Sequence, residues 1–316
     1  GTGTAHLTHT MDTFSSSVYP EDDLSAGSKE KTEEQTERDW AELPRDALLL
    51  VLEKLHQVDI FQRAELVCRP WQRAAREEPS LWRRIDIRYG NLPGSYSRGH
   101  VRYMARAAVR RSTRRCEAFL GVGVVHDWLI SLLEDSARRL KSFRIISCEN
   151  ITDKRFSREI FKFYMLEELE ISNCDSDTFA MTCLTAADSC PHLKRLRLSS
   201  PRFYKWKPRW VGREVKGITR MRGLRSLQLF AQSIGTDGLA SILDNCTKLE
   251  SLDIRHCFNV EMGDEMVARC SMFETLKLPY DSTEDYDLEF SAPEMDPNQI
   301  PPRSTYYECF KWGNLY

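Results

Sequence analysis

"LEELEISNC", residues 166–174, is the stretch that decides the fold. Its apolar side chains Leu166, Leu169 and Ile171 follow the pattern L-x-x-L-x-L, in which the last L is any aliphatic residue, and a cysteine follows three residues later. Alternation of apolar and polar residues predicts a β-strand with one buried face. Related stretches lie on both sides: "LKSFRIISC" (140–148), "LKRLRLSSP" (193–201), "LRSLQLFAQ" (224–232), "LESLDIRHC" (249–257) and "FETLKLPYD" (273–281).

The spacing of these stretches predicts a repeat array. A weaker copy, "CEAFLGVGV", begins at Cys116, and "WRRIDI" at Trp82 can form the first strand. From Cys116 the copies start 24, 26, 27, 31, 25 and 24 residues apart, and segments such as "TDGLASILDNC" between them read as helices. Because each such unit buries its apolar face only against its neighbours, we expect an α/β fold with about seven repeats over residues 88–280. Its form is a parallel β/α horseshoe, and the spacings lie within or near the range of leucine-rich repeats.

Ten cysteines occur in the chain, and the repeats account for most of them. Cys148, Cys174 and Cys257 end strand stretches, whereas Cys190 and Cys246 close helical segments. No C-x-x-C or H-E-x-x-H spacing is present, so the strong zinc signatures are absent. We expect reduced, buried thiols, no metal and no cofactor.

The charge of the chain is unevenly distributed. Residues 1–39 carry three basic and nine acidic side chains, and residues 281–316 carry two and eight, so each segment has a net charge of −6. The total is −2, which leaves +10 for the middle. Acidic ends around a Leu-rich middle predict disordered tails over 1–39 and 281–316. No apolar run approaches the roughly 20 residues of a membrane span, and residues 1–23 lack the pattern of a secretory signal. We therefore expect no membrane partner and a place in the cytoplasm, the nucleus or both.

Residues 40–87, named here the helical head, follow a different pattern. Pro44 is suited to the first turn of a helix, and Leu48, Val51, Leu52 and Leu55 then form one apolar stripe. A second stripe, with Asp59 as its expected N-cap, contains Ile60, Ala64, Val67, Cys68 and Trp71.

Pro70 predicts a break or bend between Cys68 and Trp71, and a third helix over 71–77 should end before Pro79. Such short helices cannot enclose a large core of their own. The helical head should therefore bury apolar surface against something else. We expect Cys68 to be buried and unreactive, because no neighbouring His or Lys would activate its thiol.

The helical head resembles an F-box, with its Leu-Pro start, V-C-R-x-W centre and L-W end. This resemblance implies docking on the Skp-family adaptor of a cullin–RING (SCF) ubiquitin ligase, and through it contact with a cullin and a RING protein. The adaptor-binding residues it implies are Leu43, Pro44, Leu48, Val51, Leu52, Leu55, Ile60, Val67, Cys68, Trp71 and Trp82.

The phrases "CPHLKRL" and "CTKLESL" are similar to the cysteine-containing leucine-rich repeats that follow F-boxes. Residues 224–260 and 276–287 resemble plant F-box/leucine-rich-repeat proteins of the Skp-interacting-partner type, and the resemblance covers about residues 40–287. The resemblance implies a non-catalytic receptor for a protein substrate. Period 2 sends the middle residue of each L-x-L to the concave face. The candidate substrate-binding residues there and beside it are Arg144, Glu170, Arg197, Gln228, Phe230, Asp253, Arg255, His256, Lys277 and Tyr280, together with Trp206 and Trp210 of a basic-aromatic insert.

Other functions remain open at this point. The insert, residues 201–216, interleaves basic and aromatic side chains, a composition that can bind nucleic acid or an acidic or phosphorylated segment. We favour packing or protein binding, because no nucleic-acid-binding fold accompanies it. A leucine-rich-repeat scaffold outside any ligase is the main alternative, and a receptor for a small hormone is a further one. No local catalytic signature supports an enzyme.

Overall fold

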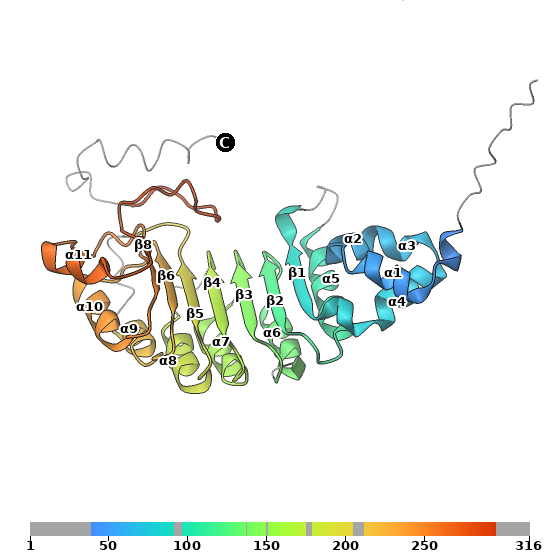
Figure 1. Cartoon of the computed structure of the whole chain (residues 1–316), viewed down its shortest axis with the longest axis horizontal. Coiled ribbons are helices and arrows are strands. Elements are labelled where there is room, and N and C mark those ends of the chain that lie inside the picture. The colour runs from blue at the N-terminus through green and yellow to red at the C-terminus, as the bar shows by residue number, and fades with distance from the viewer. Residues whose placement is uncertain are drawn as a thin grey trace, which may run out of the picture. The chain divides into compact units, whose positions relative to one another are not determined.

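Eight parallel strands form one sheet in which every strand pairs with the next along the chain (Figure 1). The structure is a computed structural model that describes residues 39–91, 97–136, 138–149, 151–174, 179–204 and 212–294. The strands are β1 (Arg84–Arg88), β2 (Ala118–Val122), β3 (Ser142–Ile146), β4 (Glu168–Ser172), β5 (Arg195–Ser199), β6 (Ser226–Phe230), β7 (Ser251–Asp253) and β8 (Thr275–Lys277). The predicted repeat array and the first strand at Trp82 are confirmed.

A helix separates each pair of neighbouring strands, and Figure 1 shows α6 to α9 side by side along one side of the sheet. The helices are α5 (Arg98–Arg111), α6 (Asp127–Leu133), α7 (Asp153–Ile160), α8 (Ala180–Ser189), α9 (Arg213–Ile218), α10 (Thr236–Asn245) and α11 (Asp264–Cys270). Ser97 caps α5, because its hydroxyl accepts a hydrogen bond from His100 N, and each of the helices has apolar residues that face the sheet.

The strand register aligns like with like across the sheet. Leu169 lies opposite Phe143 and Leu196, and all three side chains are buried against the helices. One residue further, Glu170 lies opposite Arg144 and Arg197, on the other face. Because the side-chain period of a strand is 2, one register fixes a row of leucines inside and a row of charges outside.

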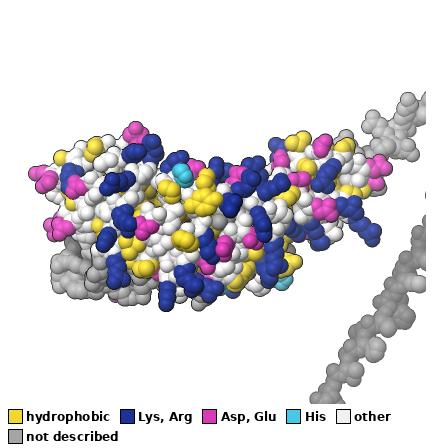
Figure 2. All heavy atoms as spheres, turned by 90° about the horizontal axis from the view of Figure 1, so that it is seen from below, with side chains coloured by type: hydrophobic (Ala, Val, Ile, Leu, Met, Phe, Trp, Pro, Cys, Tyr) yellow, Lys and Arg dark blue, Asp and Glu magenta, His cyan; other side chains and the backbone are white. Residues whose placement is uncertain are grey.

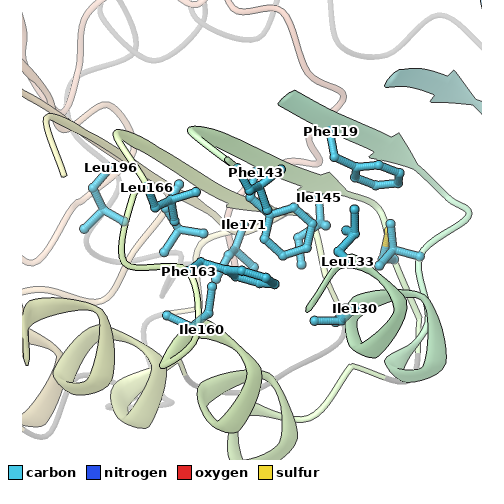
Figure 3. Packing of buried hydrophobic residues seen from close by; sticks show 14 of the residues in the cluster. Phe119, Ile130, Leu133, Phe143, Ile145, Ile160, Phe163, Leu166, Ile171 and Leu196 are labelled. Atoms are coloured by element: carbon cyan, nitrogen blue, oxygen red, sulfur yellow. The ribbon is translucent and has the colours of Figure 1, made fainter. Parts of the chain in front are cut away.

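Aromatic rings fill the core near the first repeats. Phe143 is fully buried, and its ring centroid lies 5.7 Å from those of Phe156 and Phe163 and 6.0 Å from that of Phe119. Figure 3 shows Phe143 and Phe163 between the strands and the helices, with Ile145 beside them. Burying a Phe side chain contributes roughly 1.5–3 kcal/mol, so this cluster is a main source of cohesion between repeats.

The turns after the strands repeat as well. Ser147, Asn173 and His256 follow their strands with left-handed backbones, at φ of 52°, 53° and 60°. Their amides continue the ladder: Ser147 N donates to Ser172 O at 2.8 Å, and His256 N donates to Pro279 O at 2.9 Å. The same geometry in these three repeats brings the residues after the strands to one edge of the sheet.

Buried cysteines occupy the slots that the repeats predict. Cys148 and Cys257 are at most 1% exposed, and Cys257 Sγ donates to Leu229 O at 2.7 Å. Burial raises the pKa of Cys190 to about 12 and that of Cys246 to about 11. The Cys190 and Cys246 thiols therefore stay protonated at neutral pH and act as small apolar groups.

Gly217 marks the closest approach of two helices. A Cβ at this position would lie 2.6 Å from the main-chain carbon of Cys183 and 2.8 Å from the nitrogen of Leu184, both in α8. In a free helix, alanine would be preferred to glycine by roughly 1 kcal/mol. We expect Gly217→Ala to destabilise the protein instead, by about 1–3 kcal/mol, because backbone atoms cannot yield as a side chain would.

Urea denaturation of Gly217→Ala measures this effect. Gly235→Ala is the matched control, since nothing lies within 4 Å of a Cβ there and the backbone φ of −98° suits any residue. A Gly217→Ala protein as stable as the Gly235→Ala protein would show that α8 and α9 are not in contact as described.

The helical head contains four α-helical segments: α1 (Arg45–Leu52), α2 (Gln57–Asp59), α3 (Glu65–Val67) and α4 (Arg69–Glu77), with a π-helical turn over Ile60–Ala64. The predicted break occurs at Cys68, whose backbone is extended. Pro70 lies in the first turn of α4, where its missing backbone N–H removes no helical hydrogen bond. The N-cap of the second helix is His56 and not Asp59, because the helix begins three residues earlier than its apolar stripe. Cys68 is half-buried rather than buried.

Candidate functional site: two protein-interaction surfaces

The residues selected for adaptor binding divide by burial. One group lies in the core of the helical head and holds its helices together: Leu48, Leu52, Ile60, Trp71 and Trp82. Leu43, Leu55 and Cys68 are half-buried. Pro44, Val51 and Val67 are exposed, so of the predicted set these three present the most surface to a partner.

Two exposed leucines were missed by the sequence analysis. Leu50 on α1 is 62% exposed and Leu66 on α3 is 75% exposed. Each precedes an exposed valine, Val51 or Val67. The available signal was the unbroken run "ALLLVL" (47–52), since a helix that is apolar on all sides has a second face to bury. Exposed apolar groups of this kind mark interaction sites when they gather on one element.

A cavity of about 260 Å³ opens beside these helices. Leu48 and Ala74 give it an apolar lining, and Arg45, Arg69 and Arg73 add positive charge. Pro70, the unusual residue of the V-C-R-x-W centre, also lines it. A partner segment with an apolar side chain next to carboxylates would fit such a site.

An ion-pair cluster joins the helical head to the repeats. Glu65 on α3 is only 7% exposed, and its carboxylate accepts hydrogen bonds from Arg111 at the end of α5 and from Arg76 Nε at 3.2 Å. The Arg111 guanidinium also lies 4.5 Å from the ring centroid of Phe61 and 5.0 Å from that of Trp82. Cation–π contact and a buried carboxylate together fix this arginine.

Main-chain groups of the first strand are held by the head as well. Gln57 Nε2 donates to Arg84 O at 2.9 Å, and Asp86 N donates to Gln57 Oε1 at 3.3 Å. Trp82 Nε1 donates to Ala75 O at 3.0 Å. The outer edge of β1 therefore has partners among the head residues, which protects an edge strand from other pairing.

The charged row on the open face of the sheet follows the prediction. Arg144, Glu170, Arg197, Gln228, Asp253 and Lys277 lie opposite one another across β3 to β8. Glu170 is 2% exposed and pairs with Arg144 and with Arg197 Nε at 3.3 Å. Gln228 Nε2 donates to Asp253 Oδ2 at 2.9 Å. The row is a network of paired charges, so its members are held in place rather than free in solvent.

Residues 281–294, named here the strap, correct the prediction for the C-terminal segment. The sequence predicts a disordered acidic tail from residue 281, but the strap returns over the sheet after β8 (Figure 1). Asp287 pairs with Arg197, and Asp285 pairs with Arg255 and with Lys277 Nζ at 3.3 Å. Its far end is fixed by Ser291 N donating to Pro201 O at 2.7 Å. Residues 295–316 lie outside the described residues, as do 1–38.

Aromatic packing holds the middle of the strap. The Tyr286 ring stacks on Phe230, with centroids 3.8 Å apart and planes 15° apart. Phe290 lies 5.3 Å from Phe230 and 5.2 Å from His256. Burial raises the pKa of Tyr286 to about 12, and burial with the nearby Arg255 charge lowers the pKa of His256 to about 4. Both rings are therefore neutral at pH 7.

The strap covers several candidate substrate-binding residues. Phe230, Arg255 and His256, which were expected on the open face, are at most 3% exposed. Tyr280 is half-buried and contacts Phe258 at a centroid distance of 5.0 Å. Trp206 and Trp210 lie outside the described residues, as does 205–211 as a whole. At the start of the insert, Phe203 is buried and packs edge-on against Phe258 at 5.3 Å.

A smaller hollow of about 140 Å³ remains beside the strap, lined by Arg144, Glu168, Glu170, Arg195, Arg197 and Gln228 among others. On the face drawn in Figure 2, Lys and Arg side chains are spread along the length of the molecule with Asp and Glu between them. Within the described ranges, no three His, Cys, Asp or Glu side chains come together as metal ligands, and no helix is long and apolar enough to cross a membrane.

Comparisons with known proteins agree with this architecture. A family model described as F-box-like matches residues 40–88. F-box protein SKIP19 of Arabidopsis thaliana is 35% identical to the chain, over 81% of the chain and 82% of that protein. The chain belongs to the plant F-box/leucine-rich-repeat family. Putative F-box/LRR-repeat protein 23 of the same plant is 32% identical to this F-box/leucine-rich-repeat protein. The match covers 84% of the chain but only 60% of that relative's length. Putative F-box/LRR-repeat protein 22 is 31% identical over 80% of the chain and 81% of its own length. In this F-box/leucine-rich-repeat protein, the F-box match covers the helical head together with β1, and β2 to β8 belong to the repeats.

Proposed function

We propose that the protein is the substrate-recognition subunit of an SCF ubiquitin ligase. In this role the F-box docks on a Skp-family adaptor, which connects it to a cullin and a RING protein. The open face of the repeats binds a protein substrate for ubiquitination. The place of action that we propose is the cytoplasm, the nucleus or both.

The observation that carries the proposal is the exposed apolar surface of the F-box. Leu50 and Leu66 expose most of their side chains on helices whose other faces are already buried. Leucines and valines exposed on short helices are unfavourable in water, and burying them on docking lowers the free energy by roughly 25 cal/mol per Å² of apolar surface. Membership of the F-box/leucine-rich-repeat family supports an adaptor of the Skp type as the partner.

The proposed contribution to ubiquitin transfer is positional. A chain that binds adaptor and substrate together raises the concentration of substrate lysines near the charged ubiquitin-conjugating enzyme. Such a role needs a rigid link between two binding surfaces and no catalytic group of its own. The Glu65–Arg111 cluster supplies a link of this kind between the F-box and α5.

Binding of a purified Skp-family adaptor tests the proposal. We expect the wild-type protein to bind, and Leu50→Asp/Leu66→Asp to bind at least about 100-fold more weakly, since a carboxylate cannot be buried at low cost in an apolar interface. Calorimetric titration of the two proteins gives the affinities directly.

Met272→Asp is the matched control, because Met272 is 79% exposed but lies after α11, far along the chain from the F-box. It should bind the adaptor as the wild type does. Absence of adaptor binding by the wild-type protein would reject the ligase role and favour a scaffold outside any ligase.

A further inference from the structure

The strap shows what kind of peptide the sheet face can hold. Three consecutive strap residues, Asp285, Tyr286 and Asp287, lie over β5 to β8 and contact them through their side chains. The inference below rests on the proposed function, since it concerns the substrate class of the same receptor.

The central tyrosine has contacts on every side. Its ring stacks on Phe230 at 3.8 Å, and its Oη donates to Ser199 Oγ at 3.0 Å. The guanidinium carbons of Arg197 and Arg255 lie 5.3 Å and 5.4 Å from the ring centroid. We name Ser199, Arg197, Phe230 and Arg255 the aromatic clamp. An aromatic platform with two arginines at its edges has the composition of an interaction hot spot.

The flanking carboxylates reach the same two arginines. Asp287 Oδ2 accepts a hydrogen bond from Arg197 Nη1 at 3.0 Å, and Asp285 pairs with Arg255 and Lys277. The hydrogen bond from Arg197 holds the pKa of Asp287 below its ordinary value. For Asp285, burial raises the pKa, but the hydrogen bonds and charges of Arg255 and Lys277 together lower it below its ordinary value. The clamp therefore favours an aromatic residue with an acidic residue on each side.

The clamp is built from the sheet and not from the strap. Arg197 is held by Glu170 at 3.3 Å, and Arg255 is held by Asp253 at 2.8 Å. Neither pair involves a strap residue, so we expect the arginines to keep their orientation when the strap leaves. A site that keeps its geometry without its occupant loses little entropy on binding a new one.

The strap carboxylates are poorly shielded from water. The side chains of Asp285 and Asp287 are 56% and 59% exposed, although their arginine partners are 4% and 15% exposed. Ion pairs with one exposed member are weakened by salt and contribute modestly. Stacking on Phe230 is then the main contact that a competing peptide must replace.

We propose that the aromatic clamp is a binding site for an acidic–aromatic–acidic segment of a protein substrate, and that the strap occupies this site until such a segment displaces it. The strap is covalently attached, which gives it an effective concentration of about 1 mM. A substrate segment must therefore bind more strongly than the strap does, or bind elsewhere on the protein as well.

A peptide with the sequence of residues 281–294, DSTEDYDLEFSAPE, tests the proposal by fluorescence anisotropy. The full-length chain carrying Asp285→Asn/Tyr286→Ala/Asp287→Asn has an empty clamp, and we expect it to bind the peptide saturably. The wild-type chain should bind at least about tenfold more weakly, because its strap competes. A control peptide with Ala in place of the tyrosine should bind the clamp-empty chain at least about tenfold more weakly.

Adding Arg197→Ala to the clamp-empty chain should weaken peptide binding by about tenfold or more. If the clamp-empty chain has the circular dichroism of the wild type but does not bind the peptide saturably, the proposal is overturned and the strap is a fixed part of the fold. Adaptor binding measured on the same protein separates the two hypotheses, because it depends on the F-box and not on the clamp.

Hydrogen exchange of the wild-type chain gives an independent test should the triple variant fail to fold. A displaceable strap exchanges the amides of residues 282–290 by local opening, faster than those of β5 and β6. Exchange of both segments only through global unfolding contradicts the proposal.

Discussion

Replacing Arg111 with methionine is expected to lower the free energy of unfolding by about 3–5 kcal/mol, as found when one partner of a buried ion pair is removed. Glu65 stays buried in this variant, and the Arg76 side chain, which is 54% exposed, is the ion-pair partner that remains. The loss also removes the cation from between Phe61 and Trp82. Urea denaturation followed by tryptophan fluorescence measures the change.

The double variant Glu65→Met/Arg111→Met separates the charge from the packing. Two apolar side chains of similar volume leave no unpaired charge, so we expect this protein to regain most of the lost stability. Arg98→Met is the surface control: its pair with Glu149 is about half exposed on both sides, and an exposed pair of this kind contributes little to stability. Equal losses for Arg98→Met and Arg111→Met would show that the junction is not buried.

In the proposed function the junction matters because it connects the adaptor-binding surface to the substrate-binding surface. Glu65 belongs to the F-box and Arg111 to the helix that follows β1, and the pair lies 46 residues apart in sequence. If this contact is lost, the F-box can move against the repeats, and a bound substrate is no longer held at one distance from the adaptor. We therefore expect destabilising junction variants to lose substrate ubiquitination while they still bind the adaptor.

Sequence periodicity identified the repeats and the buried sides of the F-box helices, and it did so for a physical reason. Leu48 and Leu52 recur at the spacing of one helix face, so the pattern detects the side that faces the core. Leu50 and Leu66 lie on other sides and belong to no stripe. Because docking surfaces have no fixed period, these exposed leucines required the structure.

The strap could not be predicted, because composition averages over contacts that are distant in sequence. Residues 281–316 have a net charge of −6, which indicates disorder when each charge is counted as solvated. Asp287 is instead paired with an arginine 90 residues earlier, and Tyr286 stacks on a strand residue. The row of L-x-L residues was predictable because a two-residue period fixes which side chains share a face, but the segment that covers part of the row was not.

Phe230→Ala is expected to destabilise the protein by about 3–5 kcal/mol, the range for removing a buried Phe side chain, and to release the strap. Phe230 is the last residue of β6 and lies on the same face of the sheet as Gln228. Without the strap this face would be exposed to solvent, yet Phe230 is fully buried. Tyr286, His256 and Phe290 surround its ring at 3.8, 4.7 and 5.3 Å. Hydrogen exchange of residues 282–290 together with urea denaturation measures both effects.

Phe143→Ala is the matched control, because Phe143 is equally buried but lies on the helix side of β3 (Figure 3). We expect a similar loss of stability from Phe143→Ala, while residues 282–290 exchange as slowly relative to the sheet as in the wild type. If Phe230→Ala leaves the exchange of the strap unchanged, its ring does not hold the strap. Phe230 is covered by the strap and Phe143 by the helices, and both are fully buried. The contrast between the two variants therefore separates the effect of Phe230 on the strap from the general effect of losing a buried ring.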